Sequence, residues 1–281
     1  MESVRIKAYA KINLTLNILG MQEGYHTLDS LVASVDLFDL ITIRKRRDKQ
    51  IFVTMHGLGS ESIPHDENNA VKAARLFIDK FATNGADITI YKNIPMGAGL
   101  GGSSADAAGV LKGLAKLYKV NDLATLKLLA DMTGSDTRYM LTGGFARLFG
   151  RGDIVKAIEG KMKVHILLLV PDENVSTAKC YSLFDSIGTW GGNSDLAEEA
   201  VKNEDLNALS ASLSNALTGA AASLSGGINT CIEELKEFSP LAVNMTGSGS
   251  GVYAIFDSKE LCAYAKSRYK GKAKSYILEV K

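Results

Sequence analysis

The first third of the chain alternates between apolar and polar positions, which is typical of strands with one buried face. The residues RIKAYAKINLTLNIL (5–19) and LVASVDLFDLITIRK (31–45) follow this pattern, and shorter strands are expected at IFVTMHG (51–57) and ADITIYKNI (86–94). Between the last two, HDENNAVKAARLFIDKFA (65–82) has its apolar residues at helical spacing. These residues predict an amphipathic helix with acidic residues at its start.

After a glycine-rich loop (95–104), the spacing of apolar residues becomes helical. The residues SADAAGVLKGLAKLY (104–118) predict one helix, and NDLATLKLLADMTG (121–134) predict a second that Asn121 or Asp122 caps and Gly134 ends. A hairpin is expected in TGGFARLFGRGD (142–153), and Asp136 lies in the turn before this β segment.

The distal part of the chain mixes strands and helices without strict alternation. Strands are expected at 164–170 and 275–280, helices near 177–186, 195–222, 228–237 and 260–269, and a strand–glycine turn–strand unit at 241–256. This order predicts an α+β fold in two lobes. The polar stretch at 157–163 places the domain boundary, so we expect domains at 1–158 and 159–281.

Composition narrows the classes of function. Lys plus Arg (32) and Asp plus Glu (31) nearly cancel over 281 residues, so no global field attracts nucleic acid or a membrane surface. The three cysteines, Cys180, Cys231 and Cys262, form no C-x-x-C pair, which argues against a disulfide framework or a zinc site. The start lacks the apolar core of a secretion signal, and no apolar run has the length of a membrane span. We therefore expect a cytoplasmic protein.

The loop PMGAGLGGSSADAAGVL (95–111) carries the strongest chemical signal, and its glycines even fit the spacing G-x-G-x-x-G. A dinucleotide-binding loop would follow the first strand of a βαβ unit, whereas this loop follows several elements and precedes two helices. A P-loop would need a lysine after Gly102, which is absent.

The remaining interpretation of the loop is an anion site. Glycines let backbone N–H groups approach an anion, and a helix that begins at Ser103 or Ser104 points further N–H groups at the same place. The alternative is a helix start that packs tightly against a strand, but packing alone would require fewer glycines. Phosphate groups are the anions that such loops commonly bind.

Three further features are ambiguous when each is taken alone. The segment TGSGSG (246–251) fits a soft loop over a bound group or a plain hairpin turn. Lys11 lies in a strand-like apolar stretch, where it could pair with an anion or point to water from an edge strand. Asp136 could act chemically or simply form a turn.

Taken together, AYAKINLTLNILG, EGYHTLDSLVASVDLFD, PMGAGLGGSSADAA, GSD and NMTGSGSG occur in an order that resembles the galactokinase, homoserine kinase, mevalonate kinase and phosphomevalonate kinase (GHMP) superfamily. The resemblance covers nearly the whole chain. It implies a ribosomal protein S5 domain 2-like N-terminal domain and a ferredoxin-like C-terminal domain. The combination of A-K-I-N-L with G-Y-H is similar to members that phosphorylate a cytidine diphosphate-linked polyol in the non-mevalonate route to isoprenoid precursors.

The resemblance also implies a role for each matching residue. Asp136 would be the catalytic aspartate and Lys11 its partner, ATP would be the phosphoryl donor, and Ser104 could contact Mg²⁺. The residues that would bind ATP are Asn69, Lys92, Pro95, Met96, Gly97, Ala98, Gly99, Leu100, Gly101, Gly102, Ser103 and Ser104. Those that would bind the acceptor are Asn13, Tyr25, His26, Thr177, Tyr181, Gly247 and Gly249.

The sequence departs from the family pattern mainly around the acceptor. Tyr9, Gln22, Ala105, Thr137, Arg138 and Ala216 replace residues that the family commonly has. Two alternatives therefore stay open: a diverged kinase with another alcohol acceptor, and a nucleotide-binding protein without turnover. Retention of both Lys11 and Asp136 favours an enzyme, which we expect to be a monomer or a weak homodimer.

Overall fold

The structure, a computed structural model, describes residues 2–60 and 68–281. The chain forms two compact units, each built from three segments. Unit 1 comprises Met1–Ala10, Leu37–Met96 and Gly101–Gly143, and unit 2 comprises Lys11–Asp36, Gly97–Leu100 and Gly144–Lys281. We describe each unit by itself.

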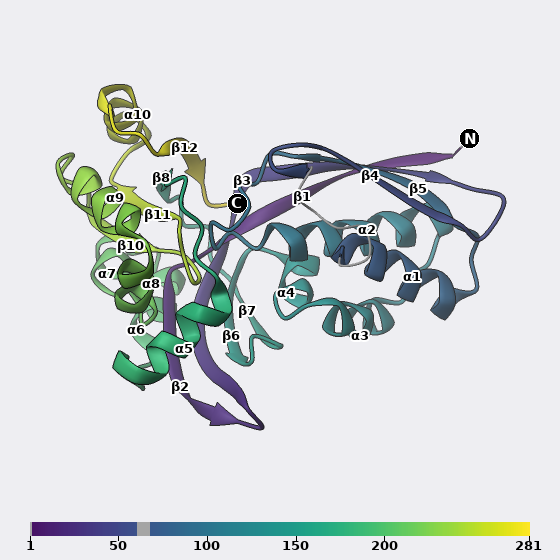
Figure 1. The fold of residues 1–281 in the computed structure, drawn as a ribbon, viewed down its shortest axis with the longest axis horizontal. Helices are drawn as coiled ribbons and strands as arrows, with labels where there is room; N and C mark the ends of the chain where they lie inside the picture. Colours follow the sequence, from purple (N-terminus) through teal and green to yellow (C-terminus); the bar gives the residue numbers. More distant parts are fainter. Residues whose placement is uncertain (1, 61–67) are drawn as a thin grey trace. The chain divides into compact units, whose positions relative to one another are not determined.

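Unit 1 is a sheet with helices packed on one face (Figure 1). Its elements are all or part of strands β1 (Ser3–Asn13), β3 (Tyr25–Lys45), β4 (Ile51–Gly57) and β5 (Ala86–Lys92), and helices α1 (Asn69–Phe81), α2 (Gly102–Tyr118), α3 (Leu123–Thr133) and α4 (Thr137–Thr142). Strand β5 runs antiparallel to β3 and parallel to β4, and β1 pairs with β3. The expected strands and helices of this region are confirmed.

Helix α2 packs closely on this sheet because two of its residues have no side chain. A Cβ at Gly109 would lie 2.5 Å from Cδ1 of Ile41, and one at Gly113 would overlap the side chain of Ile43. Both isoleucines belong to β3 and are fully buried. The alternating pattern of β3 therefore provides the surface that positions the start of α2.

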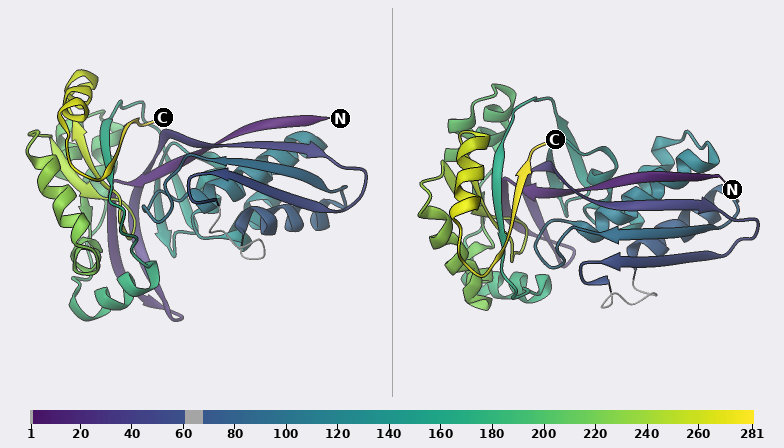
Figure 2. Two further views of the ribbon diagram at one scale, coloured as in Figure 1. Left: turned by 45° about the horizontal axis from the view of Figure 1, so that its top comes forward. Right: turned by 90° about the horizontal axis from the view of Figure 1, so that it is seen from above.

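Unit 2 contains a second, antiparallel sheet in the order β10-β11-β8-β12 (Figure 2). Besides the end of β1 and the first part of β3, the strands of this unit are β2 (Thr15–Gln22), β6 (Phe145–Gly150), β7 (Ile154–Ile158), β8 (His165–Val170), β9 (Ser214–Asn215), β10 (Ala242–Met245), β11 (Val252–Phe256) and β12 (Lys274–Glu279). Its helices are α5 (Thr177–Ile187), α6 (Asp195–Lys202), α7 (Leu206–Ala211), α8 (Thr218–Leu224), α9 (Gly226–Lys236) and α10 (Lys259–Arg268). Buried residues of β8 and β11 join those of α5, α8, α9 and α10 in one core cluster.

One prediction of secondary structure was wrong, and one short helix was missed. The region 195–222, expected to be helical, contains three short helices and strand β9, because Asp205 caps α7 and residues 214–215 pair with β2. The hairpin expected at 142–153 is confirmed as β6 and β7, but the short helix α4 before it, with Asp136 as its N-cap residue, was not predicted. Tertiary pairing and a short helix with little periodicity explain both differences.

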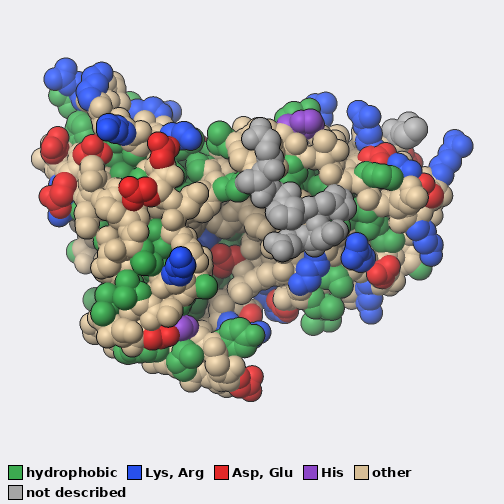
Figure 3. All heavy atoms as spheres, viewed as in Figure 1, with side chains coloured by type: hydrophobic (Ala, Val, Ile, Leu, Met, Phe, Trp, Pro, Cys, Tyr) green, Lys and Arg blue, Asp and Glu red, His purple; other side chains and the backbone are tan. Residues whose placement is uncertain are grey.

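Other expectations have mixed outcomes. Helix α1 begins at Asn69 with Asn68 as its cap, whereas the acidic residues expected at its start, 66 and 67, lie outside the described residues. The mixed α+β fold is confirmed, and the domain boundary at 158 and 159 stays a prediction. Figure 3 shows acidic and basic side chains interspersed on one face, as the balanced composition predicts. Within the described part of the chain, no helix combines the length and the apolar character that crossing a membrane requires.

Candidate active site

The start of α2 in unit 1 lacks a side-chain cap and an acidic first turn, as α4, α8 and α9 also do, but among the described helices it alone begins at a left-handed glycine. Gly101 caps it in the left-handed conformation, with φ of 70°, and neither a side-chain cap nor an acidic residue occupies the first turn. Side chains cap five other helices: Asn68 for α1, Asp122 for α3, Ser176 for α5, Asp205 for α7 and Ser258 for α10. The first N–H groups of α2 are therefore available to an acceptor from outside the protein, such as a phosphate.

The turn that carries Asp136 lies beside this helix start. The side chain of Asn69, at the start of α1, donates a hydrogen bond of 2.8 Å to Oγ of Ser103. A Cβ placed on Gly134 would lie 3.5 Å from Oγ of Ser104 and 3.6 Å from Nδ2 of Asn69. Unit 1 thus brings three predicted site residues, Asn69, Ser103 and Ser104, next to the turn that leads into Asp136.

In unit 2, hydrogen bonds hold the first half of the glycine loop. The backbone N–H of Lys11 donates to the carbonyl of Leu100, and that of Ser250 donates to the carbonyl of Gly97, each at 3.0 Å. The hydroxyl of Thr246 donates to the carbonyl of Gly99 at 3.1 Å. The loop carbonyls are thus bound by protein donors.

The glycines of the loop are required by its geometry. Gly97 and Gly99 have φ of 67° and 72°, a region that other residues rarely adopt. A Cβ on Gly99 would overlap the carbonyl oxygen of Thr246, and one on Gly97 would lie 2.5 Å from Oδ1 of Asn174. The loop therefore needs these glycines to adopt its left-handed turns and to pack against Thr246 and Asn174.

Lys11 and Asn13 form a buried polar centre in unit 2. The Lys11 ammonium donates to Oδ1 of Asn13 at 2.6 Å, and the backbone N–H of Gly247 donates to the same oxygen at 3.0 Å. The Asn13 amide also donates to the hydroxyl of Ser30. Asn13 therefore links the lysine to the second glycine loop, and the predicted contact with the acceptor stays a prediction.

The second glycine loop (246–251) closes between strands β10 and β11, as expected. The side chain of Asn215 donates to the carbonyls of Met245 and Gly247, which fixes the loop from the side. The hydroxyls of Thr177 and Ser248 lie 2.9 Å apart. Thr177, a predicted acceptor residue, therefore contacts the loop that contains Gly247, another predicted acceptor residue.

An aromatic cluster surrounds His26 in unit 2. Its ring lies 4.6 Å from the ring of Tyr181 and stacks on Trp190 at 5.7 Å with an interplanar angle of 16°. Nε2 of His26 lies 2.6 Å from a carboxylate oxygen of Asp185. The predicted pair of His26 and Tyr181 is brought together, and flat rings beside a polar edge suit a planar base.

The sequence interpretation missed Asp185 and Trp190 in this cluster. Trp190 is the single tryptophan of the chain, and a lone large aromatic after a helix is a signal that could have been used. Tyr25, the third aromatic residue predicted here, is 56% exposed and stacks under the guanidinium of Arg151. Its contact with the acceptor stays a prediction.

Lys92 does not point to solvent. Its side chain is 2% exposed, and the ammonium is bound by the carboxylates of Asp39 and Asp106. Burial alone would lower the pKa of Lys92, but the two carboxylates more than offset this effect and raise it. A direct contact with the nucleotide stays a prediction.

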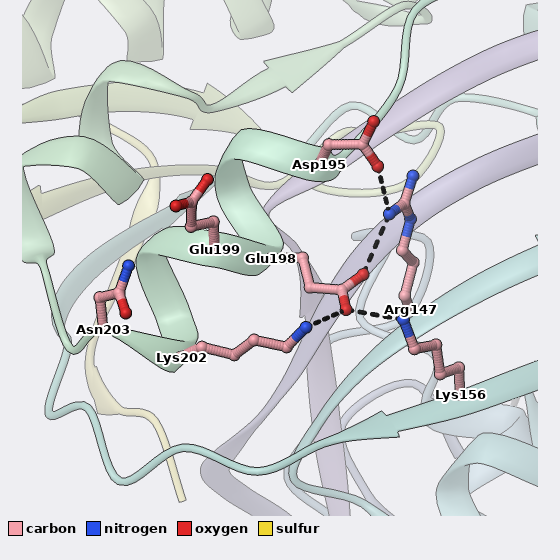
Figure 4. A pocket seen from close by; sticks show the side chains of 7 residues that line it. All are labelled: Arg147, Lys156, Asp195, Glu198, Glu199, Lys202 and Asn203. Carbon is pink, nitrogen blue, oxygen red and sulfur yellow. Dashed lines mark hydrogen bonds and ion pairs between the residues drawn. The ribbon is translucent and has the colours of Figure 1, made fainter.

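A separate charged cavity of about 400 Å³ lies near α6 in unit 2 (Figure 4). Glu198 accepts hydrogen bonds from Lys156 and Lys202, each at 2.7 Å, and from Arg147 at 3.0 Å. These donors lower the pKa of Glu198 to about 2. Because the charges bind one another, we interpret this cluster as structural. Among residues 2–60 and 68–281, no group of His, Cys, Asp or Glu side chains is arranged to hold a metal ion.

The predicted site residues divide between the two units. Unit 1 contains Asn69, Lys92, Pro95, Met96, Gly101, Gly102, Ser103, Ser104 and Asp136, and unit 2 contains Lys11, Asn13, Tyr25, His26, Gly97, Ala98, Gly99, Leu100, Thr177, Tyr181, Gly247 and Gly249. Within each unit most of these residues are neighbours in space or along the chain. Their assignment as ligands stays a prediction.

Comparison with known protein families identifies the family of this chain. The profile of the GHMP kinases N terminal domain matches residues 68–144, and that of the GHMP kinases C terminal domain matches residues 197–270. The chain belongs to the GHMP kinase family. GHMP kinases transfer phosphoryl groups, so ATP is the expected phosphoryl donor.

Over nearly its whole length, this GHMP kinase is similar to two relatives that carry the same name. It is 37% identical to a 4-diphosphocytidyl-2-C-methyl-D-erythritol kinase of Caldanaerobacter subterraneus subsp. tengcongensis, over 95% of this chain and 93% of the relative. It is also 37% identical to the enzyme of that name in Caldicellulosiruptor saccharolyticus, over 97% of this chain and 95% of the relative.

Solved structures agree with this family. A crystal structure of 4-(cytidine 5'-diphospho)-2C-methyl-D-erythritol kinase has a TM-score of 0.81 and 27% identity, and the match covers 98% of this chain and 99% of that chain. A homoserine kinase from Cytophaga hutchinsonii has a TM-score of 0.72 at 16% identity, over 100% of this chain and 95% of that chain, and shows the shared fold.

Proposed function

We propose that this GHMP kinase transfers the γ-phosphoryl group of ATP to the 2-hydroxyl of 4-diphosphocytidyl-2-C-methyl-D-erythritol, a step of isoprenoid precursor synthesis. The aromatic cluster of His26, Tyr181 and Trp190 is the observation that carries the choice of acceptor, because stacked rings suit the cytosine of that substrate. The relatives at 37% identity over nearly the full length of the chain support the same choice.

In this proposal the glycine loop and the uncapped start of α2 hold the phosphates of ATP. The open N–H groups carry partial positive charge, and the glycines let them reach the phosphate oxygens. The hydroxyl of Ser104 could also hold Mg²⁺, which neutralises charge on the β- and γ-phosphates when bound. Hydroxyl oxygen is a ligand that Mg²⁺ accepts, so the residues fit the ion.

Asp136 would accept or orient the proton of the attacking hydroxyl. A positioned base contributes about 10²- to 10⁴-fold to such a step. The Lys11 ammonium would stabilise charge on the transferring group, and a charge about 4 Å away contributes about 4 kcal/mol at an effective dielectric of about 20. Its hydrogen bond to Asn13 would keep it oriented during turnover.

The test is ATP consumption measured with a panel of alcohols in the presence of Mg²⁺. We expect turnover with 4-diphosphocytidyl-2-C-methyl-D-erythritol and none with 2-C-methyl-D-erythritol 4-phosphate, which lacks the cytidine part. Turnover only with an unrelated alcohol would overturn the acceptor, and ATP binding without turnover on any alcohol would overturn catalysis. We further propose that the enzyme acts in the cytoplasm and that it is a monomer or a weak homodimer. Ultracentrifugation of the purified chain tests the oligomeric state.

A further inference from the structure

A buried charge cluster in unit 1 has no part in the chemistry proposed above. Lys92, the last residue of β5, donates hydrogen bonds to Oδ2 of Asp39 and to Oδ2 of Asp106. All three side chains are at most 3% exposed. Buried ions require good mutual geometry to offset their lost hydration, so these three groups hold one another in fixed positions.

Asp39 connects this cluster to the residues before the glycine loop. Its other oxygen, Oδ1, accepts hydrogen bonds from the backbone N–H groups of Asn93 at 2.5 Å and Ile94 at 2.9 Å. Pro95 follows directly and begins the loop. The same carboxyl group therefore binds the cluster lysine and fixes the backbone where the loop starts.

Asp106 connects the cluster to the residues after the loop. It lies one turn into α2, two positions after Ser104. A Cβ on Gly102 would lie 3.7 Å from Nζ of Lys92 and 3.2 Å from Cγ2 of Ile94. The cluster thus lies against the start of α2, and it binds the chain on both sides of the loop.

In place of the direct contact predicted for Lys92, we propose that Asp39, Lys92 and Asp106 are positioning residues for the phosphate loop, and that they set its affinity for ATP without touching the nucleotide. The inference rests on the proposed contact between the loop and ATP. Two anchored ends fix the separation and direction of the loop, so its N–H groups are arranged before ATP arrives. Loss of one anchor would weaken ATP binding and leave the acceptor site intact.

The burial and the raised pKa of Asp106 indicate which replacement is conservative at this position. Oδ1 of Asp106 is buried and has no hydrogen-bond partner among residues 2–60 and 68–281. Burial raises the pKa of Asp106 to about 7, although Lys92 acts in the opposite direction and Asp39 adds to the rise. A carboxyl group that easily carries a proton here resembles an amide, so asparagine is the conservative replacement for Asp106.

The test measures ATP affinity by calorimetry without acceptor, and then the KM for ATP, the KM for the acceptor and kcat. For Asp106→Ala we expect the Kd and KM for ATP to rise about tenfold or more, because a small misplacement of a binding group has effects of this size. The acceptor KM and kcat at saturating ATP should change less than about threefold. Asp106→Asn should restore ATP affinity to within about threefold of wild type.

Asp79→Ala is the matched control, because Asp79 is an exposed carboxylate of α1 in the same unit. Unchanged ATP affinity in Asp106→Ala would overturn the inference. A fall in kcat together with a rise in both KM values, which Asp106→Asn does not reverse, would also overturn it. Should Asp106→Ala not fold, Asp106→Ser provides the same comparison with a shorter polar side chain. Failure of the wild-type chain to bind ATP would overturn the proposed function itself.

Discussion

The Lys11 ammonium donates a 2.6 Å hydrogen bond to the side-chain oxygen of Asn13. Both residues lie on β1, two positions apart, so their side chains leave the strand on the same face. The backbone N–H of Gly247 donates to the same oxygen. One amide therefore orients the lysine proposed for catalysis and fixes the second glycine loop.

Asn13→Ala should lower kcat about tenfold or more, because a hydrogen bond to a charged group contributes about 1.5–3 kcal/mol. Steady-state kinetics measure this change. Asn17→Ala is the control, since Asn17 is also buried but bonds Asp29 and Ser194, away from Lys11. An equal loss of kcat in both variants would show that Asn13 acts only through stability.

Asp136→Asn should abolish phosphoryl transfer, because an amide cannot accept the hydroxyl proton. The affinity for ATP should stay within about threefold of wild type, since no phosphate contact is assigned to Asp136. Coupled ADP release and calorimetry measure the two quantities. Turnover at a rate comparable to wild type would refute the catalytic assignment.

Tyr181→Ala and Trp190→Ala should each raise the KM for a cytidine-bearing acceptor up to about tenfold, because an aromatic pair contributes about 0.5–1.5 kcal/mol beyond its buried area. The KM for ATP should not change. Tyr264→Ala, at an exposed aromatic residue of α10, is the control. If acceptor KM values are the same in all three variants, cytosine does not bind at His26.

Gly99→Ala should destabilise the protein by about 1–3 kcal/mol and raise the KM for ATP, because the new Cβ would overlap the Thr246 carbonyl at a positive φ. Gly219→Ala in α8 meets no atom within 4 Å and should increase stability by up to about 1 kcal/mol. Urea denaturation and ATP kinetics distinguish the two. A Gly99→Ala variant as stable as wild type would contradict the assigned loop geometry.

Glu198→Gln should reduce the free energy of unfolding at pH 7 by about 1–3 kcal/mol, a range discounted because both lysine partners are half exposed. The pKa of Glu198 is lowered from 4.5 to about 2 in the folded state. Its stabilisation is therefore present above about pH 4.5 and is lost as the pH falls toward 2.

Urea denaturation at pH 7, 4 and 2.5 should show the wild type and Glu198→Gln becoming equal in stability as acid is added. Glu233→Gln, which breaks an exposed pair with Lys236, should change stability by at most about 0.5 kcal/mol at pH 7. A Glu198→Gln difference that stays constant with pH would contradict the low pKa.

Regular patterns in the sequence predicted most elements of the fold. The helix over 123–133 was predicted with its cap at Asn121 or Asp122 and its end at Gly134, because each signal is local, and the structure has the cap at Asp122. Strand β9 could not be predicted, since two residues carry no period and its existence depends on β2, about 200 positions away in the chain. Helix α4, with six residues, is likewise too short for a pattern.

In the candidate site too, residues with a local sequence signal were predicted and residues that depend on long-range contacts were missed. The glycine loop was identified because its residue types are unusual for their surroundings, whereas Lys11 was ambiguous alone and was assigned through the resemblance to the GHMP superfamily. The partners Asp39 and Asp106 were missed, because an acidic residue is ordinary in sequence and only the fold buries it against Lys92. Asp185 was missed for a related reason, since its contact with His26 joins residues 159 positions apart.

Strands β1 and β3 each pass from one unit into the other, and residues 97–100 of the glycine loop group with unit 2 while both neighbouring segments group with unit 1. No single cut of the polypeptide separates the units. A truncation at residue 158 would remove most of unit 2, including strand β9, which pairs with β2. Chimeric enzymes that exchange acceptor specificity between relatives should therefore transplant the discontinuous set of segments together, rather than swap halves at one junction.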